Sequence, residues 1–111
     1  MTEQQILERF YRSLEADGLA DRTIRHYGLW LTRWMAHCDE HGIDVLSPSI
    51  DDAEAWLVEL RRQYGPENVR KALSCVRAFY DWIVLRRHGR TNPFAPIRRK
   101  GMQPVRLPKG V

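Results

Sequence analysis

Apolar residues recur at helical spacing in four stretches of the chain, and no stretch shows the strict alternation of a half-buried strand. In the first stretch Ile6, Phe10 and Leu14 follow one another at four-residue steps. This spacing predicts a helix over residues 3–16 that turns one apolar face to a core. Gly18 follows as the stop, because glycine adopts the left-handed backbone conformation at low cost.

The second helical stretch runs from Asp21 to about His41, and Gly42 follows it as the stop. The loop that comes next carries Val45 and Leu46, which we expect to tuck under the helices. The inward stripe of this helix is expected to consist of Ile24, Tyr27, Leu31, Trp34 or Met35, and Cys38.

Two further helices follow. Ser49, with Asp52 three residues later, nearly matches a capping box and predicts the start of a third helix. Pro66 suits the first turn of a fourth helix, which we expect to run to about His88 with Gly89 as its stop. The inward residues of the fourth helix are expected to be Val69, Leu73, Val76, Phe79 or Tyr80, and Ile83, with Phe94 and Ile97 as plugs against the bundle.

The chain is therefore expected to be all-α, with a single compact bundle of four main helices over residues 1–97. Its 111 residues suffice for one domain with its own core. Residues 98–111 form a basic tail without periodicity, which we expect to be a mobile interdomain linker. The apolar runs are far shorter than the ~20 residues of a membrane span, and the N-terminus carries no secretory signal. Cys38 and Cys75 are expected to be free thiols of a cytoplasmic protein.

Charge divides the chain into two unequal halves. Residues 1–60 contain five basic and twelve acidic side chains, whereas residues 61–111 contain thirteen basic and two acidic ones. Such a basic second half suggests contact with a polyanion. An arginine-rich composition alone would not explain why acidic residues almost vanish after residue 60.

A basic and polar stripe runs along the predicted fourth helix. Arg70, Lys71, Ser74 and Arg77 fall at i, i+1, i+4 and i+7, opposite the inward residues. A helix fits the major groove of DNA, where such side chains read base edges and bind phosphates. A solvated helix face is the plain alternative, but the one-sided charge of the second half favours nucleic acid.

Catalytic chemistry is not apparent in the sequence. The chain has no nucleophile elbow, phosphate-binding loop or glycine fingerprint. His37, Cys38 and His41 lie within one helical turn, but the zinc-protease pattern requires Glu directly after the first histidine. A solvated helix end explains these residues better, so we expect no catalytic residue, no metal site and no cofactor.

The residues from Leu7 to Pro108 resemble the N-terminal core-binding domain of tyrosine recombinases, the group of phage integrases and Xer-like enzymes. The order and spacing of several short elements carry the resemblance, rather than any one motif. These elements are Leu7-x-x-Phe10, Leu19-x-x-x-Thr23-Ile24-x-x-Tyr27-x-x-x-Leu31, Leu73-Ser74-x-Val76-Arg77-x-Phe79-Tyr80, Asn92-Pro93 and Arg106-Leu107-Pro108-Lys109.

The resemblance implies a SAM-like helical domain that forms half of a clamp around double-stranded DNA and grips the core recombination site through its second and fourth helices. It implies no strand cleavage here, since the family's His-x-x-Arg motif is missing and no tyrosine follows Tyr80. It also implies that the full-length parent assembles as a tetramer on DNA, whereas the isolated domain is expected to be a monomer. The residues expected to contact DNA are Arg22, Thr23, Arg25, His26, Asn68, Arg70, Lys71, Ser74 and Arg77, together with Arg98, Arg99 and Lys100 of the tail.

Three positions depart from the family's pattern. Ala20 stands where the family often has Ser before the second helix, and Gly65 and Asn68 stand where it often has Ser and Thr at the fourth. Hydroxyl contacts to phosphate are therefore not expected there, although Asn68 keeps an amide donor.

Two other functions stay open. The chain would be a helical protein–protein interaction module if its basic tail were incidental. A stand-alone helix-turn-helix regulator fits less well, because the helices are long and no short helix follows a tight turn.

Leu29 and Trp30 point away from the inward stripe of the second helix. They would either pack under the loop of residues 43–48 or form an exposed apolar interface for another protein.

Overall fold

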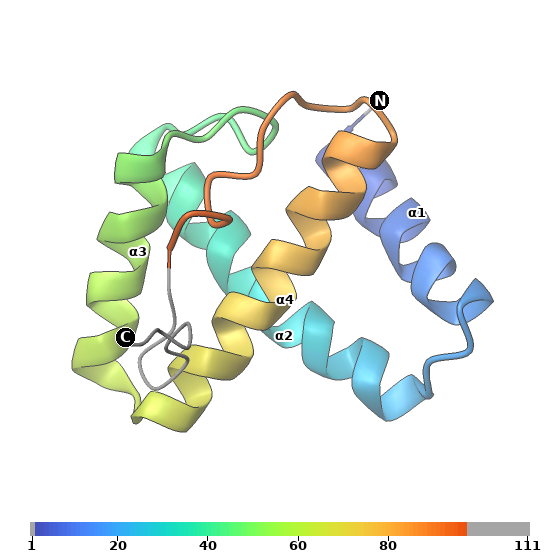
Figure 1. Ribbon diagram of the computed structural model, residues 1–111, viewed down its shortest axis with the longest axis horizontal. Helices are drawn as coiled ribbons and strands as arrows, with labels where there is room; N and C mark the ends of the chain where they lie inside the picture. Colours follow the sequence, from blue (N-terminus) through green and yellow to red (C-terminus); the bar gives the residue numbers. More distant parts are fainter. Residues whose placement is uncertain (1, 98–111) are drawn as a thin grey trace, which may run out of the picture.

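The computed structural model describes residues 2–97, which fold into the helices α1 (Glu3–Ala16), α2 (Asp21–His41), α3 (Ile50–Gln63) and α4 (Pro66–Leu85). Figure 1 shows α4 lying across the front of α2, with α3 and α1 on opposite sides. No strand occurs between residues 2 and 97, so the all-α prediction is confirmed for that range. Within it, no helix combines the length and apolar character that crossing a bilayer would require. The predicted linker, residues 98–111, lies outside the described residues.

Local sequence signals account for most helix ends. The Asp52 amide donates a hydrogen bond to the Ser49 hydroxyl at 3.0 Å, and the Ser49 amide donates to the Asp52 carboxylate at 2.9 Å, so the capping box is formed. Gly42 ends α2 in the left-handed conformation with φ 67°. Gly18 adopts the same conformation after α1 with φ 89°. The predicted bounds of the first two helices and the predicted start of the third are therefore confirmed.

The fourth helix ends at Leu85 rather than at His88, so this part of the prediction is wrong. Arg87 takes the left-handed conformation with φ 61°, and the amide of His88 donates to the carbonyl of Ile83 at 2.9 Å. This is a Schellman ending in which arginine occupies the position that glycine usually takes. Gly89 is therefore not the stop of the helix.

Gly89 is needed for close packing instead. A Cβ atom there would lie 2.7 Å from the Leu46 carbonyl oxygen and 2.9 Å from Ile83 Cγ2. Gly89→Ala is therefore expected to lower the free energy of unfolding by about 1–3 kcal/mol, because backbone has to move. Gly28→Ala is the matched control, since its methyl group would meet only the Tyr11 side chain, with the hydroxyl oxygen at 3.5 Å. Alanine inside that helix is expected to stabilise by up to about 1 kcal/mol. Urea denaturation measures both changes, and equal stability of the two variants would contradict this role of Gly89.

Aromatic side chains fill the centre of the bundle. Trp34 of α2 and Tyr80 of α4 are fully buried, and Trp34 Nε1 donates a hydrogen bond to Tyr80 Oη at 2.7 Å. Tyr80 in turn donates to the carbonyl oxygen of Val45 at 2.7 Å, which ties the loop between α2 and α3 to both helices. The inward residues predicted on α2 and α4 are buried or half-buried as expected. Trp30 is buried as well, which was one of the two alternatives for it, and His37 is buried although the sequence did not predict that.

The segment after α4 closes one side of the core. Phe94 is fully buried, with its ring centroid 5.1 Å from that of Trp34 and 5.8 Å from that of Tyr80. Ile97 is half-buried against the same core, so both predicted plugs are confirmed. The Asn92 side-chain amide donates to a backbone carbonyl of α4 at 3.1 Å and holds the segment in place.

Candidate nucleic-acid interface

The stripe predicted on α4 lies on the solvent-facing side of that helix. Lys71 is exposed, and Arg70, Ser74 and Arg77 are half-buried, whereas the opposite side of the helix is buried in the core. Asn68, three residues before Lys71, is exposed as well. The five residues expected to contact DNA from this helix therefore share its outer side.

Two arginines on this side have partners within the protein. Arg70 Nη1 forms an ion pair with Glu67 Oε1 at 2.7 Å. Arg77 Nη2 donates to the carbonyl oxygen of Ala95 at 2.7 Å, so it also anchors the segment after α4. Lys71 makes no hydrogen bond or ion pair with residues of the described range. Lys71 is thus the cation of this side that is most available to a phosphate group.

The beginning of α2 supplies the second part of the candidate surface. Arg22, Thr23 and Arg25 are exposed, and His26 is half-buried. Among the residues that the structure describes, none forms an ion pair with Arg22 or Arg25. Their charges therefore face solvent near the positive end of a helix dipole.

Both helices that reach this surface begin without a side-chain cap in the described part of the chain. Ala20 precedes α2 and Gly65 precedes α4, and neither has a side chain that accepts from the first turn. Apart from Pro66, the first backbone N–H groups keep their hydrogen-bonding capacity for an anion. Backbone donors thus stand where the resemblance to tyrosine recombinases predicts hydroxyl groups.

An aromatic contact positions the start of α4 against α2. The Trp30 ring packs edge-on against Tyr64, just before α4, with 5.4 Å between the ring centroids. The Arg33 guanidinium lies over both rings, 4.9 and 5.2 Å from their centroids. In Figure 1 the first turns of α2 and α4 both lie at the lower edge of the molecule. The two segments expected to contact DNA therefore lie along one edge.

Of the two alternatives for Leu29 and Trp30, the exposed patch does not hold for Trp30. Its side chain is only 2% exposed, because it packs against Tyr64 and Arg33. Leu29 is 45% exposed. A protein interface at Leu29 stays a prediction, but it lacks the neighbouring tryptophan as an anchor.

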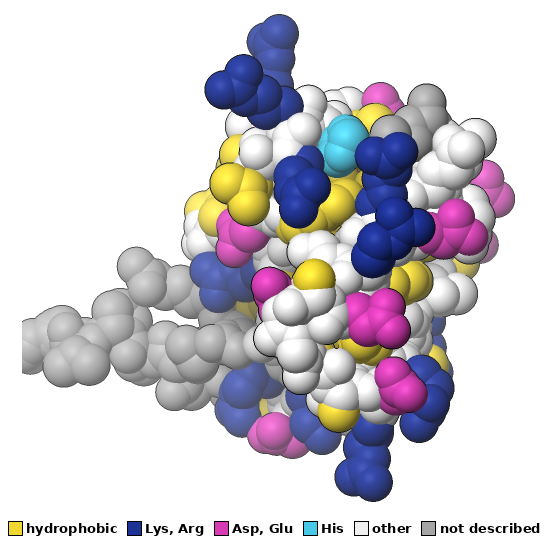
Figure 2. Space-filling view, turned by 90° about the vertical axis from the view of Figure 1, so that its right-hand side faces the viewer, with side chains coloured by type: hydrophobic (Ala, Val, Ile, Leu, Met, Phe, Trp, Pro, Cys, Tyr) yellow, Lys and Arg dark blue, Asp and Glu magenta, His cyan; other side chains and the backbone are white. Residues whose placement is uncertain are grey.

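The side of the molecule formed by α1 has a different character. Figure 2 looks onto α1 together with the beginning of α2 and shows Lys and Arg side chains interspersed with Asp and Glu side chains. A surface of mixed sign attracts a polyanion less than a surface of one sign. The α1 side is therefore a poorer candidate for DNA contact than the outer side of α4.

The metal ligands considered from the sequence separate in the structure. Cys38 is buried in the core, and burial raises the pKa of its thiol to about 12. Burial also raises the pKa of the Cys75 thiol to about 12, and both cysteines are free as predicted. His37 and His41 lie instead beside Glu59 of α3, a residue that no local pattern connects with them. Burial, and then the neighbouring His41, lower the pKa of His37.

Comparison with known protein families defines the class of this chain. Residues 6–90 match the family of phage integrase N-terminal SAM-like domains. The match covers more than half of the chain and reaches into all the helices α1 to α4, so the chain belongs to this family. The resemblance expected from the sequence is thereby confirmed. Searches of curated proteins and of solved structures found no match.

Proposed function

We propose that this chain is the DNA-binding domain of a site-specific tyrosine recombinase and takes part in DNA integration or recombination by gripping the core recombination site. The observation that carries the proposal is the solvent-facing basic and polar side of α4, in a member of the phage integrase N-terminal family. The start of α2, which carries the exposed Arg22 and Arg25, lies at the same edge of the molecule as the start of α4 (Figure 1).

The residues of the surface divide between two tasks. Lys71, Arg22 and Arg25 carry exposed charges, which suit phosphate contacts that hold the domain on the duplex. Asn68 and Ser74 are short and polar, and Thr23 and His26 offer further donors, which suit base edges in the major groove. Arg70 and Arg77 contribute charge from positions already fixed by Glu67 and Ala95. Arg98, Arg99 and Lys100 lie outside the described residues and are proposed to add phosphate contacts.

The chemistry of strand exchange is assigned to a catalytic domain of the parent enzyme. The role of the present domain is to position that enzyme on double-stranded DNA, in the cytoplasm where bacterial and phage DNA reside. It needs no cofactor for this role. We propose that the isolated domain is a monomer and that self-association to a tetramer belongs to the full-length parent on DNA.

A protein-interaction module is the second candidate function. Leu29 and Leu85 favour it, since they are 45% and 73% exposed. The dependence of DNA affinity on salt separates the two functions. Release of counterions from several phosphates makes the affinity fall steeply as salt rises, whereas a protein-interaction module would bind DNA weakly at every salt concentration.

Charge removal at the proposed surface is expected to weaken DNA binding. Lys71→Ala and Arg25→Ala should each raise the Kd for a labelled duplex about fivefold, which corresponds to about 1 kcal/mol. Each should also lower the slope of log K against log salt by about 0.9. Arg9→Ala on the exposed side of α1 removes the same charge and is the matched control. Fluorescence anisotropy measures the DNA affinity of all three variants. An equal loss of affinity in Arg9→Ala would mean that only the net charge of the protein matters, which would contradict the proposed surface.

A further inference from the structure

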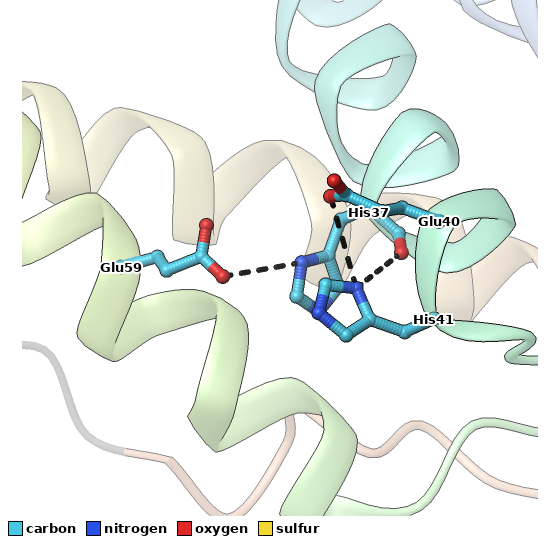
Figure 3. Close-up of polar contacts among 4 residues, drawn as sticks. All are labelled: His37, Glu40, His41 and Glu59. Carbon is cyan, nitrogen blue, oxygen red and sulfur yellow. Dashed lines mark hydrogen bonds and ion pairs between the residues drawn. The ribbon is translucent and has the colours of Figure 1, made fainter.

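Two histidines and a glutamate from different helices come together at the open end of the groove between α2 and α3. His37 and His41 are one helical turn apart on α2, and their ring centroids are 4.2 Å apart. Glu59 of α3 faces them, with its Oε2 atom 3.7 Å from His37 Nδ1 (Figure 3). Each of the three residues offers one ligand atom, and these atoms all lie within 4.8 Å of one another.

We propose that His37, His41 and Glu59 form a binding site for a divalent transition-metal cation of the Zn²⁺ type. Imidazole nitrogen and carboxylate oxygen are ligands that Zn²⁺ accepts, and three protein ligands leave a fourth position for water. Tetrahedral bonds of about 2.0–2.1 Å place ligand atoms about 3.4 Å apart. The 3.7 Å gap between His37 and Glu59 is close to that spacing and too long for a hydrogen bond.

The hydrogen bonding of His41 leaves one ring nitrogen for a metal. His41 Nδ1 lies 2.9 Å from the backbone carbonyl oxygen of His37, which can only accept. Nδ1 therefore carries the proton, and Nε2 keeps its lone pair. A backbone carbonyl that orients a metal-binding histidine through its other nitrogen is a common outer-shell arrangement.

The surroundings of the three residues suit a cation. The Trp34 ring stacks on His37 with 5.7 Å between centroids, so the buried imidazole is held in one orientation. Glu59 and His41 are 47% exposed in their side chains, which leaves them free to close on an ion. His37 and Glu59 border a hollow of about 310 Å³ that is also lined by Glu40 and Arg33. Arg33 opposes a cation, but its guanidinium is engaged over the Trp30 and Tyr64 rings.

A metal at this place would link α2 directly to α3. Both helices otherwise meet through aromatic packing, such as the Trp34 and Trp56 rings with centroids 5.2 Å apart. An ion that binds only the folded chain raises the stability of the fold by mass action. Zinc is therefore expected to raise the Tm of the protein.

Calorimetric titration of the untagged 111-residue protein with ZnCl₂ tests the proposal. The expected result is one Zn²⁺ per chain and an increase in Tm. His41→Ala and Glu59→Gln alter exposed side chains and should keep the fold, yet each should raise the Kd for Zn²⁺ at least about tenfold, as even outer-shell changes cost about 10–100-fold. Glu40→Gln removes the neighbouring carboxylate and His26→Ala removes a distant histidine, so both controls should bind Zn²⁺ nearly as tightly as the unaltered protein.

Substitution of Co²⁺ for Zn²⁺ identifies the ligands independently. Three nitrogen and oxygen ligands with one water should give the strong visible absorption of tetrahedral cobalt without a sulfur-to-metal charge-transfer band. A sulfur band would assign the ion to a cysteine and overturn the proposal. So would equal affinity in the unaltered protein and His41→Ala, or a larger loss in Glu40→Gln than in Glu59→Gln. None of these measurements uses DNA, so their failure would leave the proposed function untouched.

Discussion

Phe94→Ala is expected to lower the free energy of unfolding by about 3–5 kcal/mol. The Phe94 ring is fully buried and contacts rings of α2, α3 and α4, namely those of Trp34, Trp56 and Tyr80. Its removal leaves a cavity that rigid neighbouring rings cannot fill. Urea denaturation followed by tryptophan fluorescence measures the change. Leu85→Ala removes a side chain that is 73% exposed and should alter stability by no more than about 0.5 kcal/mol.

A small effect of Phe94→Ala, similar to that of Leu85→Ala, would mean that the segment after α4 does not close the core in solution. That outcome would also affect the candidate DNA surface. Arg77 donates to the carbonyl of Ala95 in the same segment, and Asn92 donates to the Asp81 carboxylate at 2.9 Å. The segment is therefore part of what holds the outer side of α4 in its present shape.

Tyr80→Phe is expected to cost about 2–4 kcal/mol of unfolding free energy, although it removes a single oxygen atom. The change leaves two buried groups without a partner, the Trp34 indole N–H and the Val45 carbonyl. Each such group costs about 1–3 kcal/mol. Tyr27→Phe is the matched control, because Tyr27 is only half-buried and its change should cost much less. Equal losses in the two variants would contradict the role assigned to the Tyr80 hydroxyl.

The same hydroxyl adds a dependence of stability on alkaline pH. Burial raises the pKa of Tyr80 above the ordinary value of 10.0. The folded state therefore favours the protonated form more than the unfolded state does, and its stabilisation is fully present below pH 10. It is lost progressively as the pH rises above that value. The free energy of unfolding lost between about pH 9 and about pH 11 should therefore be smaller in Tyr80→Phe than in the unaltered protein.

The fold could be predicted from the sequence where the signal was local. The helix bounds follow from four-residue apolar spacing, the Ser49 and Asp52 capping box, and glycines in the left-handed conformation. Each of these signals lies within a few residues of the helix end that it determines. The end of α4 escaped this reasoning because Arg87 adopts a conformation that favours glycine. Nothing in the neighbouring sequence distinguishes that arginine from Arg86.

Features that depend on contacts between helices could not be predicted in the same way. The helical spacing of α2 places Trp30 away from the inward stripe. Trp30 is nevertheless buried, because Tyr64 from outside α2 packs against its ring. Glu59 joins His37 and His41 only because α3 packs beside α2, while Cys38 turns into the core. The candidate DNA surface was partly predictable, because the helical period of α4 shows which of its residues share the outer side. The contact of Arg77 with Ala95 was not, since it depends on how the chain returns after the helix.

Mapping of backbone amide NMR shifts on addition of a DNA duplex reports which surface of the domain binds DNA. We expect the largest shifts at residues 22–26 of α2 and 68–77 of α4, and we expect them to fade as salt is raised. Shifts confined to α1 and α3, or shifts that salt does not change, would contradict the proposed surface.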